Sequence, residues 1–141
     1  MLSYLFYKIA KADLASFEIP DEYTAFIAAA GLALTLRQCA VQGGLSLLLQ
    51  RIIIAEAMLL ISGLIMGFGD AKLFAALSLL FGARVVFVFV CSLFAAGIYC
   101  AVRVARRKLK MTDHIAFAPF ISVCAMAVYF ELLITPSCDL L

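Results

Sequence analysis

Long apolar stretches, each about as long as a membrane-crossing helix, constrain this chain more than any other feature. They lie near residues 22–41, 44–64, 83–102 and 115–134, and one spanning helix needs about 20 apolar residues. Hydrophobic residues make up 67% of the 141 positions and charged residues 14%, whereas soluble domains average about 45–50% and 25%. The sequence therefore predicts an integral membrane protein with one domain over residues 1–141.

A shorter apolar segment follows Gly67-Phe68-Gly69-Asp70 and is expected to form a helix over residues 71–81. Eleven residues rise about 16 Å, roughly half the hydrocarbon thickness. The helix therefore either begins below the membrane surface, with Asp70 inside the membrane, or lies where the bilayer is thin. Residues 2–10 are apolar but too few to cross alone. We expect an all-α polytopic bundle of about five to six transmembrane helices.

Basic residues indicate how the bundle is oriented. If the spans alternate, one side carries Lys8, Lys11, Lys72, Arg103, Arg106, Arg107, Lys108 and Lys110, whereas Arg37 and Arg84 lie on the other and Arg51 lies within a span. Cytoplasmic loops are enriched in Lys and Arg, so the first side is expected to face the cytoplasm. The prediction is a multi-pass protein of the inner (cytoplasmic) membrane, with Asp13 and Asp70 at its cytoplasmic face.

The basic run over residues 103–110 is expected to contact anionic headgroups of the lipid bilayer. Such a short loop beside a membrane span is a poor candidate for binding nucleic acid, so we expect no nucleic-acid partner.

Asp70 ends a long apolar run, where an ionisable side chain costs at least about 2.5–3.5 kcal/mol and by default marks a functional site. Asp13 is a second acid near the N-terminus. Paired aspartates hydrolyse peptides when one carboxyl is neutral and the other ionised, which follows when two carboxylates lie about 3 Å apart. Only tertiary packing could bring these two acids together.

An ordinary interpretation of the Gly-x-Gly-Asp segment stays open. The pattern can arise by chance, with Asp70 paired to Lys72 and with Gly67 and Gly69 supplying turn conformations of positive φ. In the functional alternative, the two glycines let an extended peptide lie beside Asp70. Lys72 either extends to the membrane interface or interacts with an acidic group of the substrate or with Asp70.

Other charged residues are expected to serve structure. Asp21 follows Pro20 and is expected to cap the next helix rather than to act in catalysis. Arg51 and Glu56 lie within one span and are expected to face the protein interior. His114, the one histidine, is expected to be solvated.

The five cysteines, at positions 39, 91, 100, 124 and 138, are expected to be small buried apolar residues. None is spaced as Cys-x-x-Cys, the arrangement typical of structural zinc sites. We therefore expect no metal and no cofactor.

Three segments together resemble the type IV prepilin peptidases, aspartyl proteases that process prepilin and pseudopilin leaders. The first runs from Asp13-Leu14 through Ile19-Pro20-Asp21 to Thr24, and the second is Gly67-Phe68-Gly69-Asp70-Ala71-Lys72 with the apolar residues that follow. The third, residues 114–120, is similar to the family's Ile-Pro-Phe-Gly-Pro-Phe, with alanine at two positions.

The resemblance implies the fold of the Gly-x-Gly-Asp intramembrane aspartyl proteases, with Asp13 and Asp70 as the catalytic pair and Gly67, Gly69 and Lys72 beside the substrate. It also implies a prepilin or pseudopilin substrate, cut at the cytoplasmic face after a glycine that ends a short basic leader. Proteolysis in the family needs no metal. N-methyltransferase activity is not expected, because the paired Cys-x-x-Cys motifs of the long members are absent.

One departure leaves other functions open. Family members have a complete membrane helix before the first catalytic aspartate, whereas residues 1–12 precede Asp13 here, so that helix is expected to be truncated. A catalytically inactive relative that serves pilus or secretion-system assembly is one alternative. A small carrier that uses Asp70 as a proton site is another.

Overall fold

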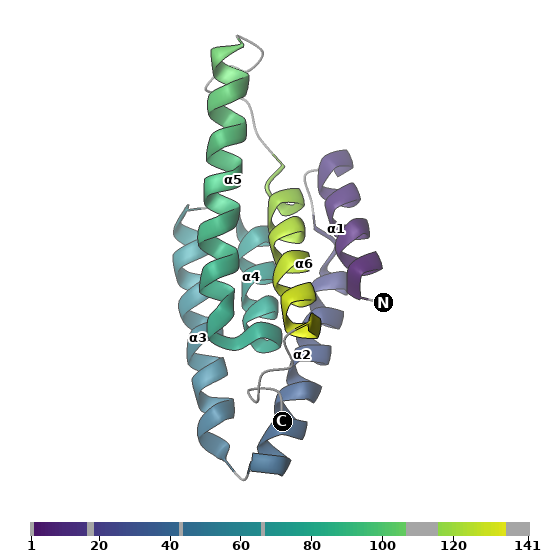
Figure 1. Ribbon diagram of the computed structural model, residues 1–141, viewed down its shortest axis with the longest axis vertical. Helices are drawn as coiled ribbons and strands as arrows, with labels where there is room; N and C mark the ends of the chain where they lie inside the picture. The colour runs from purple at the N-terminus through teal and green to yellow at the C-terminus, as the bar shows by residue number, and fades with distance from the viewer. Residues whose placement is uncertain (1, 17–18, 43, 66, 107–115, 135–141) are drawn as a thin grey trace.

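The computed structural model describes residues 2–16, 19–42, 44–65, 67–106 and 116–134, and every regular element in these ranges is helical (Figure 1). The all-α expectation is therefore confirmed for the described residues. The elements are α1 (Leu2–Ser16), α2 (Asp21–Gln42), α3 (Leu45–Ile65), α4 (Phe68–Phe81), the 3-10 helix η1 (Gly82–Arg84), α5 (Val85–Ala105) and α6 (Ala118–Ile134).

Two stretches of the described residues are long and apolar enough to cross a membrane. One is α3 (Leu45–Ile65), and the other runs over Phe68–Ala105 and contains α4, η1 and α5. A shorter apolar stretch covers Ala118–Leu132 in α6. The larger number of spans expected from the sequence, about five to six, stays a prediction.

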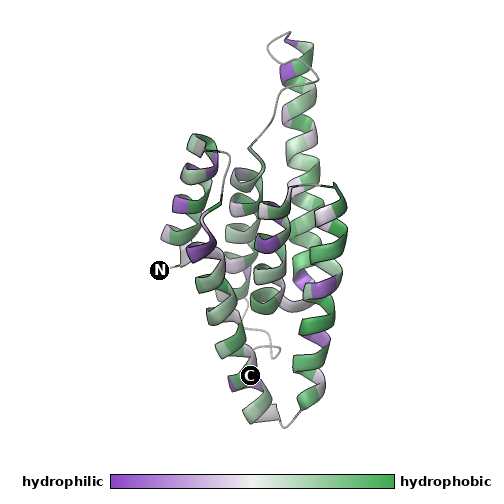
Figure 2. Cartoon of the chain, turned by 180° about the vertical axis from the view of Figure 1, so that it is seen from behind, coloured by the Kyte–Doolittle hydropathy of each residue, from purple (hydrophilic) through white to green (hydrophobic). Residues whose placement is uncertain are grey.

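Helix α4 lies at the centre of the bundle. It packs against α3 and α2 along most of its length, and Figure 2 shows α2 and α3 diverging from their connection with α4 between them. Leu73, Phe74 and Leu77 of α4 are fully buried. The approach of α2 is close, because a Cβ built on Gly31 would lie 2.7 Å from the backbone nitrogen of Leu80. Glycine at position 31 therefore lets the two helices touch.

Of the other three helices, α5 contacts α4 directly. Helix α1 packs against α6, and α6 packs against α5. Phe6 and Ile9 of α1 are fully buried, and the rings of Phe74 and Phe89 join α4 to α5 with centroids 5.1 Å apart. These contacts hold α1, and hence its C-terminal residues, at the side of the bundle.

Two helices are longer than the sequence predicts. Helix α1 continues past the apolar residues 2–10 and includes Asp13. Helix α4 begins at Phe68 rather than at residue 71, with Gly67 as its extended N-terminal cap. Asp70 therefore lies in the first helical turn, where a carboxylate interacts favourably with the helix dipole. The 14 residues of α4 span about 21 Å.

Candidate functional site

Three helix ends meet at one end of the bundle. The C-terminal end of α1 and the N-terminal ends of α4 and α6 lie in its upper part in Figure 1. These ends carry Asp13, Asp70 and Ala118 respectively. Residues that are far apart in the sequence are therefore gathered into one region.

Asp13 is buried, with 5% of its surface exposed, and its carboxylate oxygen Oδ2 accepts a hydrogen bond of 2.9 Å from the backbone N–H of Ala118. Ala118 is the first residue of α6, and the first N–H groups of a helix have no partner within the helix. Asp13 thus caps α6 from a neighbouring helix.

The same burial controls the proton affinity of Asp13, which lies in α1, outside the two candidate spans. Burial raises the pKa of the Asp13 carboxyl above its usual value, because the charged form loses solvation, while the Ala118 hydrogen bond acts in the opposite direction. The net shift is upward, so the fold favours the neutral acid more than water does.

Asp70 is partly buried at the start of α4, and its carboxyl group interacts electrostatically with that of Asp13. Tertiary packing has therefore brought the two acids near each other. Two neighbouring carboxyl groups bind protons as a coupled pair rather than independently. Such a pair can hold one proton and one negative charge at the same time.

Gly67 and Gly69 flank the approach to Asp70. A Cβ on Gly67 would meet no atom within 4 Å, and one on Gly69 would lie 3.9 Å from the Ile19 side chain. Gly82 is the one glycine with positive φ among the described residues. The interpretation that Gly67 and Gly69 supply positive-φ turns is therefore wrong. The space beside Gly67 is open instead.

Lys72 points to α2 rather than to Asp70. Its Nζ lies 2.9 Å from Oδ1 of Asp21, in a pair whose side chains are 46% and 75% exposed. The interpretation that Lys72 pairs with Asp70 is therefore wrong, because Lys72 is two residues further along α4 and faces another side of that helix. Asp21 is the first residue of α2, and its carboxylate bonds to Lys72. Its role as a helix cap stays a prediction.

Two polar groups near the acids were not identified from the sequence. The N–H of Ala118 is a backbone donor, which no side-chain pattern reveals, although the third family-like segment includes the residue. Ser122 follows one turn later on the same face of α6. Its hydroxyl oxygen is buried and has no hydrogen-bond partner in the structure.

Several expectations concern residues outside those described, including His114 and the basic residues 107–110. Among the described residues, no group of three or more His, Cys, Asp or Glu side chains could hold a metal ion. The described cysteines, at positions 39, 91, 100 and 124, are free.

Comparison with known proteins gives one match. The model of the type IV leader peptidase family matches residues 1–102. The matched region contains both aspartates and the Gly-x-Gly-Asp segment, and it ends before the third family-like segment. No curated protein and no solved structure matches the chain significantly.

Proposed function

The chain belongs to the type IV leader peptidase family, and from this premise we propose that it is a prepilin leader peptidase. This membrane protein would act as an aspartyl endopeptidase that cuts the basic leader of type IV prepilin-like proteins after a glycine. The observation that carries the proposal is that the helix ends bearing Asp13 and Asp70 lie at the same end of the bundle.

The chemistry of such a pair is well defined. The ionised carboxyl takes a proton from water, whose oxygen attacks the scissile carbonyl carbon, while the neutral carboxyl donates a hydrogen bond to the carbonyl oxygen. The carbon–nitrogen bond then breaks, and the leaving amine takes up the proton. Burial of Asp13 favours its neutral form and the hydrogen bond from Ala118 favours its ionised form, so the pair as a whole, rather than one named acid, holds the shared proton.

The surroundings of Asp70 suit an extended substrate. The open space at Gly67 and the absence of a side chain at Gly69 allow a peptide backbone to pass over the start of α4. Lys72 and Asp21 form an exposed ion pair beside this path, so Lys72 can exchange Asp21 for an acidic group of the peptide. Gly67, Gly69 and Lys72 are therefore the proposed substrate contacts.

The proposed orientation places this end at the cytoplasmic face of the inner membrane. Helix α5 ends at the same end of the bundle, where Arg103 lies in its last turn and Arg106 follows directly after it. An excess of basic residues is typical of the cytoplasmic side. Helices α2 to α6 would then form the membrane bundle, within the range of about five to six spans.

A catalytically inactive relative is the second candidate, and the hydrogen bond between Asp13 and Ala118 favours it. A carboxylate that caps α6 has a structural purpose that needs no catalysis. In that case the chain would serve as a membrane component of pilus or secretion-system assembly.

A cleavage assay with defined variants separates the two candidates. Membranes that contain the wild-type chain, Asp13→Asn or Asp70→Asn are incubated with a prepilin substrate, with Glu22→Gln, an exposed acid of α2, as the matched control. General acid–base groups contribute about 100- to 10,000-fold in rate, so each Asn variant is expected to lose at least about 100-fold while Glu22→Gln retains activity. Unchanged cleavage by either Asn variant would exclude the catalytic pair.

A further inference from the structure

An open groove of about 380 Å³ runs along α4 between α2 and α3. In α4 it follows one helix face from Lys72 to Leu79, a rise of about 10 Å. Its wall includes the alanines at positions 25, 28, 55, 75 and 76, whose small side chains leave the space between the three helices unfilled. The volume lies within the range of about 300–1,000 Å³ that is typical of small-ligand pockets. The groove can therefore hold an apolar chain.

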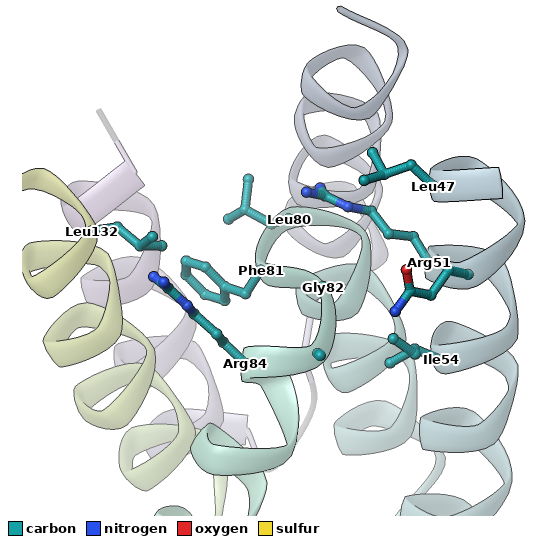
Figure 3. Close-up of a pocket in the computed structure, with 10 residues that line it drawn as sticks. Leu47, Arg51, Ile54, Leu80, Phe81, Gly82, Arg84 and Leu132 are labelled. Atoms are coloured by element: carbon teal, nitrogen blue, oxygen red, sulfur yellow. The ribbon is translucent and has the colours of Figure 1, made fainter. Parts of the chain in front are cut away.

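Arg51 of α3 fixes one end of this groove. Its Nη1 donates to the backbone oxygen of Leu79 at 2.8 Å and to the hydroxyl of Thr35 at 3.0 Å, and its Nη2 donates to Oε1 of Gln38 at 2.7 Å. Figure 3 shows Arg51 extending from α3 toward the Leu80–Gly82 segment at the end of α4. One guanidinium group therefore joins the three helices that form the groove.

Glu56 of the same helix lies differently. Arg51 faces the interior, as expected, whereas Glu56 is exposed, contrary to the expectation. Five positions along an α-helix correspond to a rotation of about 140°, so the two side chains do not share a face. Arg51 thus has a structural role within the bundle that Glu56 does not share.

The other end of the groove carries an ion pair. Nζ of Lys72 lies 2.9 Å from Oδ1 of Asp21, and both side chains are exposed to a large extent. A lysine ammonium has three donors and an ionised carboxylate has two acceptor oxygens, so this one bond leaves each group able to bind a further partner. Thr24, the other polar residue among the described residues of the wall, donates its hydroxyl to the backbone oxygen of Asp21 at 2.9 Å. This end therefore offers a positive and a negative group side by side.

We propose that the groove binds phosphatidylethanolamine, with one acyl chain along the alanines and the headgroup at Lys72 and Asp21. The headgroup carries a phosphate and a primary ammonium, which complement Lys72 and Asp21 in charge without breaking the bond between them. Phosphatidylcholine has the same charges, but its methylated ammonium has no N–H to donate to Asp21. Phosphatidylglycerol has no ammonium at all. The site thus recognises the zwitterion rather than the phosphate alone.

The ion pair also places the headgroup within the bundle. Asp21 is the first residue of α2, and Lys72 lies near the start of α4, so the headgroup belongs at the end of α4 that carries Asp70. Lipid binding does not depend on the proposed peptidase activity. Where Lys72 also contacts a substrate, the substrate would displace the headgroup.

Thermal unfolding of the purified full chain in detergent, followed by circular dichroism, tests the proposal. Dioleoyl phosphatidylethanolamine is expected to raise the midpoint temperature with a saturable dose dependence. The phosphatidylcholine and phosphatidylglycerol with the same acyl chains are expected to bind at least about threefold more weakly, the size expected for one exposed charge contact. O-phosphoethanolamine, the headgroup without acyl chains, is expected to give no shift. An affinity for either other lipid that equals or exceeds that for phosphatidylethanolamine would overturn the proposal, as would an equal shift with O-phosphoethanolamine.

Variants locate the site. Asp21→Asn is expected to lower the apparent affinity for phosphatidylethanolamine at least about threefold and to leave that for phosphatidylglycerol unchanged. Ala75→Leu, which fills the groove, is expected to lower it about tenfold, equivalent to excluding about two methylene groups of the acyl chain. Glu22→Gln and Ala29→Leu, at exposed positions of α2 outside the groove, are the matched controls and are expected to bind as the wild type does. Equal losses in the controls, or no loss in Asp21→Asn and Ala75→Leu, would overturn the proposal.

Sedimentation in detergent distinguishes the lipid from a second copy of the chain. If the wild type sediments as a dimer, Ala75→Leu sediments as a monomer, and phosphatidylethanolamine shifts the unfolding of neither, then a second copy fills the groove and the proposal is wrong. If both sediment alike and only the wild type responds to phosphatidylethanolamine, the lipid assignment is supported.

Discussion

Opposite charges lie at the two ends of α4, and their surroundings differ. The negative one belongs to Asp70 of α4 itself, and the positive one belongs to Arg51 of α3, which contacts the other end. Asp70 lies in the first turn, beside open space at Gly67, whereas Leu79 near the last turn accepts hydrogen bonds from Arg51 and Thr35. Both charges suit the helix dipole. The difference is that the acid has room for a ligand beside it, while the arginine is held by three hydrogen bonds to neutral acceptors.

This comparison separates two uses of charge within one bundle. At the arginine end, charge satisfies backbone carbonyls that would otherwise lie unpaired far from water. At the aspartate end, a second carboxyl lies near the first, and an arrangement of like groups weakens a fold rather than strengthening it. We therefore expect substitutions at the arginine end to change mainly stability and those at the aspartate end to change mainly activity.

Arg51→Leu is expected to have the largest effect on stability. It removes three hydrogen bonds, leaves the Gln38 side chain without this donor and leaves the Leu79 oxygen with Thr35 as its remaining donor. Hydrogen bonds to charged groups contribute about 1.5–3 kcal/mol each. We expect a loss of at least about 3 kcal/mol in the free energy of unfolding, with a smaller loss for Arg51→Lys. Denaturation in detergent, followed by circular dichroism, measures both, and equal stability of Arg51→Leu and wild type would contradict the structural role.

Gly31→Ala is expected to separate α2 from the same end of α4. The new Cβ would lie 2.7 Å from Leu80 N and 2.8 Å from the Leu79 carbonyl carbon, and overpacking costs about 1–3 kcal/mol. Gly97→Ala is the control, because a Cβ there meets no atom within 4 Å and alanine favours helix by about 0.5–1 kcal/mol. Opposite signs in the two unfolding midpoints would support the close approach.

The helix-capping role of Asp13 can be tested separately from its role as an acid. Asparagine can still accept the hydrogen bond from Ala118, whereas alanine cannot, and loss of a helix cap costs about 0.5–2 kcal/mol. Asp13→Ala is expected to unfold more easily than Asp13→Asn, and both should lose cleavage if Asp13 is catalytic as proposed. If the two variants were equally stable, the hydrogen bond would contribute nothing to the fold.

The pH dependence of Asp13 sharpens the same test. Because burial raises its pKa in the folded state, its contribution to stability is complete below the unfolded value of about 3.9 and is lost as the pH rises through the folded value. The wild type is therefore expected to lose stability relative to Asp13→Asn as the pH rises from about 4. A difference that stays constant between acidic and neutral pH would contradict the burial of the acid.

Lys72→Met is expected to have the smallest effect on stability. Its ion pair with Asp21 is exposed, and such pairs contribute about 0–1 kcal/mol. If Lys72 contacts substrate as proposed, cleavage should fall through a higher KM rather than a lower kcat. A stability loss above about 1 kcal/mol would show instead that the pair holds α2 against α4.

The sequence predicted the helices well because their apolar stretches are long. The boundaries of α3 and α5 differ from the expected ones by only a few residues. The start of α4 was misplaced, since the glycines at 67 and 69 suggested a turn, whereas Asp70 is favourable within the first helical turn. Gly and Asp at a helix start give a weak signal of where the helix begins.

Partners of individual polar residues were harder to predict than helices. Nothing local in the sequence shows that Lys72 contacts Asp21 or that Asp13 caps α6, because each contact joins separate helices. The inward position of Arg51 was predictable from its place in an apolar run, but its acceptors on α2 and α4 were not. The sequence can thus nominate a charged residue, and only packing can supply its partner.

The short length of α4 has a consequence for how this protein responds to different lipids. Both of its ends contact other parts of the protein, through Arg51 at one end and α2 at the other. When the bilayer thickness changes, helices tilt or the lipid around the protein thins or thickens, each at modest cost. These adjustments should leave the distance between Asp70 and the opposite end of α4 unchanged. If the chain cleaves prepilins as proposed, the position of the cleaved bond should therefore be the same in thick and thin membranes, even where the overall rate differs.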